Sequence, residues 1–427
     1  MTITIKKMFW KFLSLNLFIF HVLLFATEGN DAITPQLACS PSDEHFAVWC
    51  RFDNTNYIVQ SSRFENFSWT TPVDISSLTK SARDCDICCP ATGKAIAIWY
   101  ATDANSMCIR VSHFSEGAWS APIDLSTSGR PACSPQICGD IYGNAFAIWR
   151  SSNGTNEIIQ CSHFNGSSWS TPIDLSSSGE NAYSPKICCD NLGNARAVWS
   201  RFDGTYYIIQ ESHFDGTSWS TPLDISSNNA NTYDTTICCG PSDHSFLVWR
   251  EDNSTHFTIC VSNFEDPSWS APIQISESGK NSYTPHVCCN DADNAIVVWS
   301  GSDGTNELIH ASHFDGMTWS SPTILSTSGE IASDPKVCEN SSGNAFTIWA
   351  RTDGSSLIVQ VSYFDGSVWS SPTDLSDLAC NSRLPQICCD DLGHASTVWY
   401  INNGMYQVIQ TSSYNGTSWS IPVSLSN

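Results

Sequence analysis

The chain of 427 residues has few basic residues, and no part of it has the pattern of an α-helix. Its 19 lysines and arginines are outnumbered by 42 aspartates and glutamates, which gives a formal net charge of −23. A chain this acidic, without a basic patch, is a poor partner for nucleic acid or for an anionic membrane surface. No stretch of twelve residues shows apolar side chains at helical spacing, so the pattern favours an all-β fold.

Long hydrophobic runs are also scarce, and the only one lies at the N-terminus. Lys6, Lys7 and Lys11 introduce an apolar run from Phe12 to Ala26, which is followed by small and polar residues. This order is typical of a secretory signal peptide, here residues 1–29, and an uncleaved anchor is the alternative. We expect no integral membrane segment in the mature chain, which would be secreted, periplasmic or attached to a cell surface.

Motifs of common enzymes are missing as well. The chain contains no HExxH, no G-x-S-x-G, no P-loop and no unique Ser/His/Asp grouping. Catalysis requires one set of residues that differs from its surroundings, whereas the units described below are nearly alike. We therefore expect no enzyme activity, no cofactor and no metal site.

What the chain does contain is a strict period of 50 residues in eight copies, marked by two sets of tryptophans. The first set is Trp49, Trp99, Trp149, Trp199, Trp249, Trp299, Trp349 and Trp399. The second set is Trp69, Trp119, Trp169, Trp219, Trp269, Trp319, Trp369 and Trp419. A period of this length indicates a solenoid, a propeller or a similar array.

One unit, residues 184–226, contains four apolar runs of five to eight residues between turns rich in Gly, Asn, Asp and Ser. These are strand signals, and Asp203-Gly204 suits a tight hairpin turn. The second run, residues 195–199, is apolar on both sides in most units, which is typical of a strand buried on both faces. Only the connection between units, for example residues 177–185, is long enough to cross a sheet from its outer to its inner edge.

Four up-and-down strands followed by such a crossing form a propeller blade. The sequence therefore predicts an all-β, eight-bladed β-propeller with four antiparallel strands per blade, in a single domain over residues 30–427. A linear solenoid is the alternative, but it requires distinct capping repeats, and the end units resemble the others. We expect contiguous blades, with the first packed against the eighth. The expected blades are residues 31–77, 78–127, 128–177, 178–227, 228–277, 278–327, 328–377 and 378–427.

The unit, GNAxAVW…DG…SxFDGxxWSxP, resembles the tandem propeller repeats of exported bacterial proteins over about 400 residues. It is also similar to the Asp-box, S-x-D-x-G-x-x-W, of sialidase-type propellers. Ser212, Gly216 and Trp219 match that spacing, whereas Asp215 lies one place too late. The resemblance implies a structural turn between the third and fourth strands. Ser212 is expected to hydrogen-bond across this turn, and Phe214 and Trp219 to fill the space between blades.

A catalytic sialidase is the less favoured alternative. That resemblance would demand an arginine triad, a tyrosine–glutamate pair and an aspartate from different blades, with an early Phe-Arg-Ile-Pro stretch that this chain lacks. The arginines here recur after the second strand of several units, as a variable feature of the repeat. The histidines at 113, 163, 213 and 313 also share one slot, which favours packing over ligation.

Cysteine is unusually frequent, with 20 residues. Thirteen recur at two adjacent slots on the first strand of each unit: Cys39, Cys88, Cys89, Cys138, Cys188, Cys189, Cys238, Cys239, Cys288, Cys289, Cys338, Cys388 and Cys389. We expect most of these to be reduced and buried, because cysteine packs as a small hydrophobe, and more than half of all 20 to be free. A disulfide framework is the rival, since export permits oxidation. The better disulfide candidates are the cysteines outside these slots: Cys50, Cys85, Cys108, Cys133, Cys161, Cys260 and Cys380.

The variable polar and aromatic residues are expected on one face, at the second-to-third-strand turns and the crossings. Variable side chains on a repeated scaffold are a common origin of binding specificity. The candidate ligand-binding residues are Arg150, Arg201, Arg250, Arg351, Tyr183, Tyr206, Tyr207, Tyr233 and Tyr283, and a solvated rim is the alternative interpretation. The predicted function is a multivalent binding module, lectin-like or adhesive, for glycans or cell-surface proteins. A structural or protein–protein scaffold of the cell envelope is the alternative.

Overall fold

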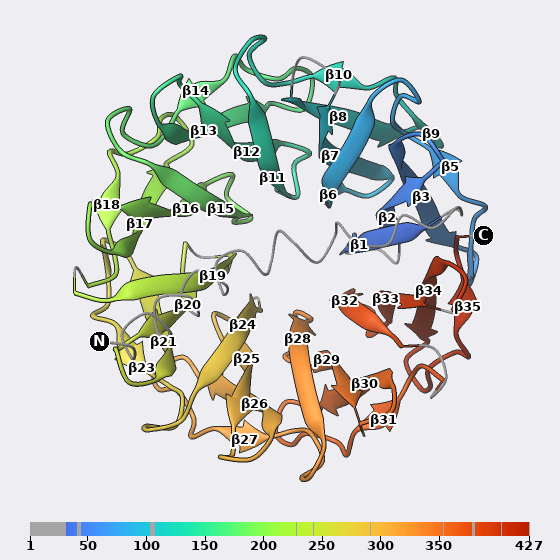
Figure 1. The fold of residues 1–427 in the computed structure, drawn as a ribbon, viewed down its shortest axis with the longest axis vertical. Helices are drawn as coiled ribbons and strands as arrows, with labels where there is room; N and C mark the ends of the chain where they lie inside the picture. The colour runs from blue at the N-terminus through green and yellow to red at the C-terminus, as the bar shows by residue number, and fades with distance from the viewer. Residues whose placement is uncertain are drawn as a thin grey trace, which may run out of the picture.

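The computed structural model describes residues 31–40, 44–102, 107–227, 229–241, 243–290, 292–352, 354–377, 381–402 and 404–426. They form eight antiparallel sheets arranged in a ring, each built from consecutive strands. Figure 1 shows the first strand of each sheet nearest the centre and the shortest strands at the rim. The predicted eight-bladed β-propeller is confirmed, whereas the predicted signal peptide lies outside the described residues. In the part of the chain that the structure describes, no helix could cross a membrane.

Each blade has an inner strand, two central strands and short outer segments. The inner strands are β1 Ala32–Cys39, β6 Ser81–Ala91, β11 Ala132–Gly139, β15 Ala182–Cys189, β19 Asn231–Cys239, β24 Ser282–Cys289, β28 Ile331–Glu339 and β32 Arg383–Cys389. The second strands are β2 His45–Phe52, β7 Lys94–Thr102, β12 Ala145–Ser152, β16 Ala195–Phe202, β20 Ser245–Asp252, β25 Ala295–Ser302, β29 Ala345–Thr352 and β33 Ala395–Asn402. The third strands are β3 Tyr57–Glu65, β8 Met107–Ser115, β13 Glu157–Phe164, β17 Tyr207–Phe214, β21 Phe257–Glu265, β26 Glu307–Phe314, β30 Leu357–Phe364 and β34 Gln407–Tyr414.

The outer strand is much shorter than the sequence suggests. The part present in every blade is a two-residue strand: β5 Val73–Asp74, β10 Ile123–Asp124, β14 Ile173–Asp174, β18 Leu223–Asp224, β23 Ile273–Gln274, β27 Thr323–Ile324, β31 Thr373–Asp374 and β35 Val423–Ser424. Three blades add β4 Ser68–Trp69, β9 Ala118–Trp119 and β22 Ser268–Trp269, and others have a single bridge such as Phe214 with Trp219. The gap falls at the repeated proline, for example Pro222, which has no N–H to donate to a neighbouring strand.

Successive strands run in opposite directions between the two faces of the ring. The crossings between blades and the turns between second and third strands, such as residues 203–206, lie on what we call the crossing face. The turns between first and second strands and between third and fourth strands, such as residues 190–194 and 215–218, lie on the opposite, turn face. The turns are locally determined: the Asp215 carboxylate accepts hydrogen bonds from the N–H groups of Thr217 and Ser218, both at 2.9 Å. As predicted, the Ser212 hydroxyl donates across the turn to the carbonyl of Ser220 at 2.8 Å.

The two tryptophan sets differ in their burial and in what they contact. Trp199 and its seven equivalents are the largest fully buried side chains. The Trp199 indole N–H donates to the Gln210 Oε1 at 3.1 Å, and the Gln210 amide donates to Asp224 at 2.8 Å, which ties three strands together. The second set is half-buried and packs between blades: Trp219 lies 5.8 Å from the Phe146 ring of the preceding blade. Truncating a buried aromatic of this kind typically costs about 3–5 kcal/mol.

The ring closes as predicted, with the first blade packed on the eighth. One hydrophobic cluster combines Trp49 and Ala47 of β2 with Val398 of β33 and Ile409 of β34. The backbone N–H of Gln407 donates to Asp31 at 2.9 Å, and a disulfide joins Cys39 to Cys388. Among the described strands none is exchanged between the ends, because each sheet consists of strands that are consecutive in the chain.

The cysteine prediction is wrong in one respect. The three disulfides, Cys39–Cys388, Cys138–Cys189 and Cys188–Cys239, all use the repeated slots, whereas the described cysteines outside those slots are thiols. Inner strands of neighbouring blades converge near the axis, which brings the paired Cα atoms to 5.6–5.9 Å, inside the range a disulfide needs. Cys380 lies outside the described residues.

The prediction that most cysteines are reduced and buried agrees with the structure in the number of thiols but not in their burial. Thirteen described cysteines are thiols, which is more than half of the chain's 20. Seven of these thiols lie in the repeated slots, but only Cys88 among those seven is fully buried.

Candidate functional site

The register of each blade brings the predicted arginines and tyrosines to the crossing face. In the fourth blade Arg201, near the end of β16, pairs with Ala182 at the start of β15, and Tyr183 follows on β15. Tyr207 begins β17 opposite Phe202, directly after Tyr206 in the turn. The other predicted residues occupy equivalent or nearby positions in the third to seventh blades. They are therefore on one face, but spread over several blade junctions.

Arg201 and Arg351 are held in the same way in their blades. The guanidinium of Arg201 donates to Glu180 at 2.9 Å and to Asp224 at 3.0 Å. Arg351 repeats this with Glu330 at 2.9 Å and Asp374 at 3.1 Å. Only 12% and 11% of these two arginine side chains are exposed. In each case the guanidinium joins an acid of the crossing to an acid of the outer strand of the same blade, so these two arginines position the crossing loops.

Arg250 lies among aromatic rings where the fifth and sixth blades meet. Its guanidinium carbon is 5.0 Å from the Tyr233 ring, 4.7 Å from Phe257 and 5.6 Å from Tyr283, within the range of cation–π attraction. The Asp234 carboxylate forms an ion pair with Arg250, 2.9 Å from its Nε. Burial raises the pKa of both Tyr233 and Tyr283, so their hydroxyls remain protonated donors.

Arg150 and Tyr183 form a looser pair at the junction of the third and fourth blades. The Arg150 guanidinium lies 5.8 Å from the Tyr183 ring, 2.9 Å from the Cys133 sulfur and 3.4 Å from Glu157. The Tyr183 ring is 6.1 Å from that of Tyr207. Arginine with tyrosine and an acidic residue therefore occurs at both of these junctions, and Arg83 also lies over the Tyr57 ring, at 4.1 Å, where the first and second blades meet.

Sequence reasoning missed a ring of backbone bulges on the same face. In every blade the pairing of the inner strand with the second strand slips by one residue near its start. The residue in the bulge has a positive φ between 46° and 55° in all eight blades, although none is glycine: Thr34, Asp84, Ser134, Ser184, Asp234, Thr284, Asp334 and Leu384. Strained backbone of this kind clusters at functional sites. The repeated Ser/Thr/Asp before proline was the available signal.

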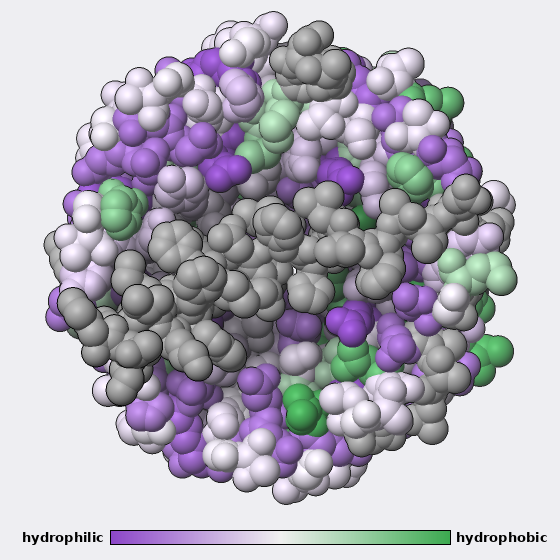
Figure 2. Space-filling view, in the orientation of Figure 1, coloured by the Kyte–Doolittle hydropathy of each residue, from purple (hydrophilic) through white to green (hydrophobic). Residues whose placement is uncertain are grey.

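Two residues beyond each bulge, every inner strand has a polar residue: Gln36, Asp86, Gln136, Lys186, Thr236, His286, Lys336 and Gln386. Burial, together with repulsion from Lys186 of another blade, lowers the pKa of Lys336 to about 8. Burial also lowers the pKa of His286 well below its usual value, aided by the same lysines. Lys186 donates to Gln136 at 2.7 Å. Acidic, basic and polar side chains of several blades therefore gather on the inner strands, and the face of the ring seen in Figure 2 is largely hydrophilic where it is coloured.

The two described cavities lie elsewhere, between neighbouring blades toward the turn face. One, of about 690 Å³, is bounded by Trp269 and Trp319 and includes the exposed side chain of Met317. The other, of about 770 Å³, lies between the second and third blades beside His113 and Trp169. The turn face therefore also has grooves that could accept a ligand.

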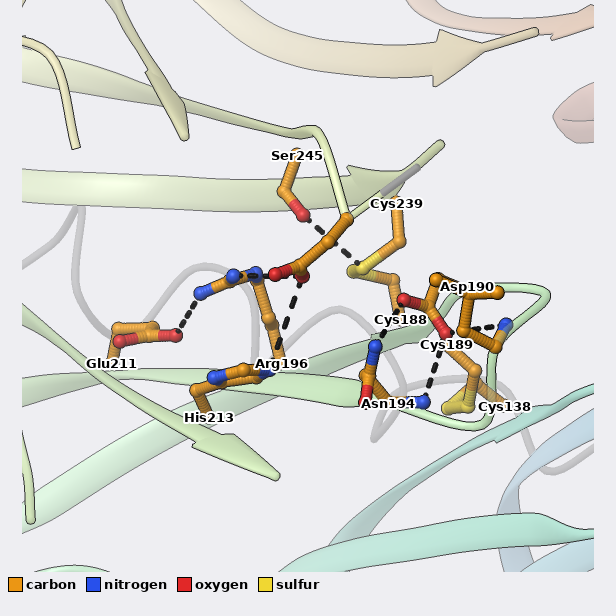
Figure 3. Close-up of a disulfide and its surroundings, with 12 residues drawn as sticks. Cys138, Cys188, Cys189, Asp190, Asn194, Arg196, Glu211, His213, Cys239 and Ser245 are labelled. Carbon is orange, nitrogen blue, oxygen red and sulfur yellow. Dashed lines mark hydrogen bonds and ion pairs between the residues drawn. A yellow bond between two sulfur atoms is a disulfide. The ribbon is translucent and has the colours of Figure 1, made fainter. Parts of the chain in front are cut away.

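A charged cluster breaks the symmetry where the fourth blade meets the fifth (Figure 3). Arg196 occupies a slot that is apolar in most blades and donates to Glu211 at 2.9 Å and to Asp243 at 2.8 Å. Its guanidinium carbon lies 3.4 Å from the centre of the Phe264 ring. Burial raises the pKa of Glu211, against the attraction of Arg196. Arg196 and Glu211 are 2% and 4% exposed, so these two residues pack the junction, whereas Asp243 is partly exposed.

The predicted packing role of the histidine slot agrees with the structure. His163 stacks on Phe146 at 4.3 Å, and the Nε2 of His113 accepts from the Trp169 indole at 2.9 Å. Burial lowers the pKa of both imidazoles.

One group of potential metal ligands occurs among the described residues, Cys39, His45 and Cys388. The two sulfurs are already joined in the closing disulfide, and the His45 Nδ1 contacts the Ser396 hydroxyl at 2.6 Å. With the sulfurs bonded to each other, this group has the chemistry of a disulfide rather than of a metal site.

No family model and no curated protein matches this chain. Solved structures do share its architecture. A polysaccharide lyase of family PL25, an ulvan lyase bound to -[GlcA(1-4)Rha3S]-, has a TM-score of 0.52 at 9% identity, covering 82% of this chain and 94% of the lyase. A puromycin-hydrolysing peptidase of Mycobacterium tuberculosis has a TM-score of 0.52 at 10% identity, covering 87% of this chain and 58% of the peptidase. These similarities support the propeller fold alone.

Proposed function

We propose that this protein is an exported, non-enzymatic β-propeller whose crossing face binds glycans of a cell surface at several blades at once. The observation that carries the proposal is the ring of eight strained bulges on that face, seven of which present a small hydroxyl or carboxylate side chain, Leu384 being the exception. Around it, Arg250 with Tyr233 and Tyr283 supplies flat rings and fixed donors. Sugars are recognised by this combination of an apolar ring face and directed hydrogen bonds.

Repetition is the second support. Eight blades offer related positions around one axis, and linked weak sites gain avidity without any new contact. The disulfides between blades favour an oxidising location outside the cytoplasm, where such a surface meets glycans. The formal charge of −23 favours neutral over acidic glycans.

The face is tested on a glycan array, followed by affinity measurements with variants. The double variant Arg201→Ala and Tyr233→Ala is expected to weaken binding at least tenfold, because it releases the crossing loop that Arg201 positions and removes an aromatic ring from the crossing face. The matched control, Glu265→Ala with Met317→Ala, alters exposed groove residues of the turn face and should leave affinity unchanged. Binding lost only in the control would move the site to the turn-face grooves, and glycan cleavage on the array would overturn the non-enzymatic proposal.

A structural scaffold is the second candidate, and the disulfides across blade junctions favour it because they brace the ring. A scaffold cross-linked to other envelope proteins would be recovered from cells only with detergent and a reducing agent. Recovery in buffer alone would argue against it.

A further inference from the structure

The three disulfides follow one pairing rule. Each joins the first repeated cysteine slot of one blade (residues 38, 88, 138 and so on) to the second slot of the next blade (residues 39, 89, 139 and so on). Cys138–Cys189 and Cys188–Cys239 each span 51 residues. Cys39–Cys388 spans 349, which is one 51-residue step short of eight 50-residue repeats. The same geometry therefore holds around the ring, including at its closure.

Two further junctions have cysteine in both slots. Cys238 lies opposite Cys289, and Cys338 lies opposite Cys389, again 51 residues apart. Cys289 lies close enough to Cys238, and Cys389 close enough to Cys338, to influence the pKa of the partner thiol. Their strands have the register of the bonded pairs: Cys238 pairs with Phe246 and Cys289 with Ala295, just as Cys188 pairs with Arg196 and Cys239 with Ser245. None of the four is fully buried.

At each of the three remaining junctions, one of the two slots is occupied by a residue other than cysteine. Cys288 faces Glu339, with its sulfur 3.9 Å from the carboxyl Oε2. Cys88 faces Gly139, where an added Cβ would lie 2.7 Å from the Cβ of Pro90. Ala38 faces Cys89. The unmatched cysteines of the repeated slots are therefore Cys88, Cys89 and Cys288, and every other one has a partner across a junction.

We propose that Cys238–Cys289 and Cys338–Cys389 are two further disulfide sites, so that five disulfides join the inner strands of the exported protein. The oxidant is a small-molecule disulfide such as oxidised glutathione. One protein thiolate attacks it, forms a mixed disulfide and expels one glutathione thiolate. The second protein thiolate then attacks the protein sulfur of the mixed disulfide and expels the other. Two protein thiols lose two protons and two electrons, and one glutathione disulfide becomes two thiols.

The five bonds divide the ring into two covalent blocks. Blades three to six form one block and blades seven, eight and one form the other, while the second blade is linked to neither. The unlinked junctions are those on either side of the second blade and the one between the sixth and seventh.

The test counts thiols in the full chain after equilibration in a glutathione redox buffer. Burial raises the pKa of Cys238 and Cys389, which slows thiolate attack, so equilibration needs mildly alkaline pH and hours. The protein is then denatured without reductant and alkylated, and its intact mass gives the number of free thiols. Replacing one partner of a disulfide by serine frees the other, so Cys289→Ser and Cys389→Ser should each raise the count by one. The matched control Cys288→Ser removes a free thiol and should lower it by one.

A count that falls by one in Cys289→Ser and Cys389→Ser, as in the control, would overturn the proposal. Fragmentation mass spectrometry of the unchanged protein gives a second readout that does not depend on variant folding. It should find Cys238 bonded to Cys289 and Cys338 bonded to Cys389, and alkylated Cys238 and Cys338 would contradict both sites.

Discussion

Two blade junctions with the same backbone show how differently a buried acid can be accommodated. Between the fourth and fifth blades, Glu211 has Arg196 at 2.9 Å, and a disulfide lies nearby at the inner strands (Figure 3). Between the sixth and seventh blades, Glu339 replaces a cysteine, and its described partners are the Asn290 amide at 2.7 Å and the Cys288 thiol. Burial raises the pKa of Glu339 to about 8, so it is mostly protonated at neutral pH.

The difference teaches that a repeated junction tolerates an acid in two ways: by pairing it with a buried cation, or by keeping it neutral. Both ways carry a cost, because a buried charge or polar group loses its hydration. The four predictions that follow test this comparison.

The largest effect is expected from Arg196→Ala. It leaves Glu211 and Asp243 without their cation in a closed junction, and breaking a buried ion pair typically costs about 3–5 kcal/mol. Denaturant unfolding with the disulfides intact measures the loss. Removing an exposed ion pair with Lys280→Ala is the control, and it should cost less than about 1 kcal/mol. An equal loss of unfolding free energy in both variants would show that the ion pairs of Arg196 contribute no more to stability than an exposed ion pair does.

Glu339→Cys is expected to create the missing bond of the sixth junction. The new thiol would face Cys288 in the geometry of the three existing disulfides, and such a bond typically adds about 2–4 kcal/mol. The free thiol count should fall by one relative to the unchanged protein, and the unfolding midpoint should rise. Glu339→Ser, which cannot form the bond, separates this gain from the removal of the acid. Two free thiols at 288 and 339 would show that the strands here are too far apart.

Restoring the apolar pattern at the fourth junction is expected to be neutral or stabilising. The triple variant Arg196→Phe, Glu211→Val and Asp243→Gly copies the residues found at these slots in other blades, such as Phe246, Val261 and Gly343. Replacing a buried ion pair by packed apolar groups is typically neutral or worth about 1–4 kcal/mol. A loss of stability as large as that of Arg196→Ala would show that the charges are needed.

The smallest effect is expected from pH, through the change in the free energy of unfolding per pH unit that Glu339 causes. Its folded pKa, about 8, lies above the unfolded value of 4.5, so the folded state holds the proton more tightly. The stabilisation that Glu339 contributes is therefore fully present below about pH 4.5. It decreases as the pH rises from there to about 8, by at most about 1.4 kcal/mol per pH unit. Unfolding of the unchanged protein and of Glu339→Gln at pH 5.5 and 7.5 measures this. The decrease should be smaller in the variant, and equal slopes would refute the assignment.

The sequence was sufficient for the propeller because the fold depends on features that every unit repeats. The spacing of Trp199 and Trp219, the Asp-Gly turns and the single long connection all act within one blade. Even the shortness of the outer strand had a sequence signal in Pro222, which was read as part of a continuous strand.

The chemistry at the junctions was not predictable in the same way, because it depends on distances between blades. Cys188 and Cys239 are bonded only because the inner strands converge near the axis. Arg196 looked like an exception in an apolar slot until Asp243 of the next blade was placed beside it. The bulge at Ser184 depends on strand register, which a hydrophobic pattern alone does not determine. The crossing-face arginines were placed on the expected face, but their acidic partners were not foreseen.

The closing disulfide has a mechanical consequence. Cys39 ends β1, and Cys388 lies near the end of β32, so a pulling force applied to the two ends of the chain passes through one covalent bond. Such a force can peel away only β1 on one side and β33, β34 and β35 on the other. The remaining blades lie inside a closed loop that carries no tension, and they would stay folded under loads that unravel an open ring.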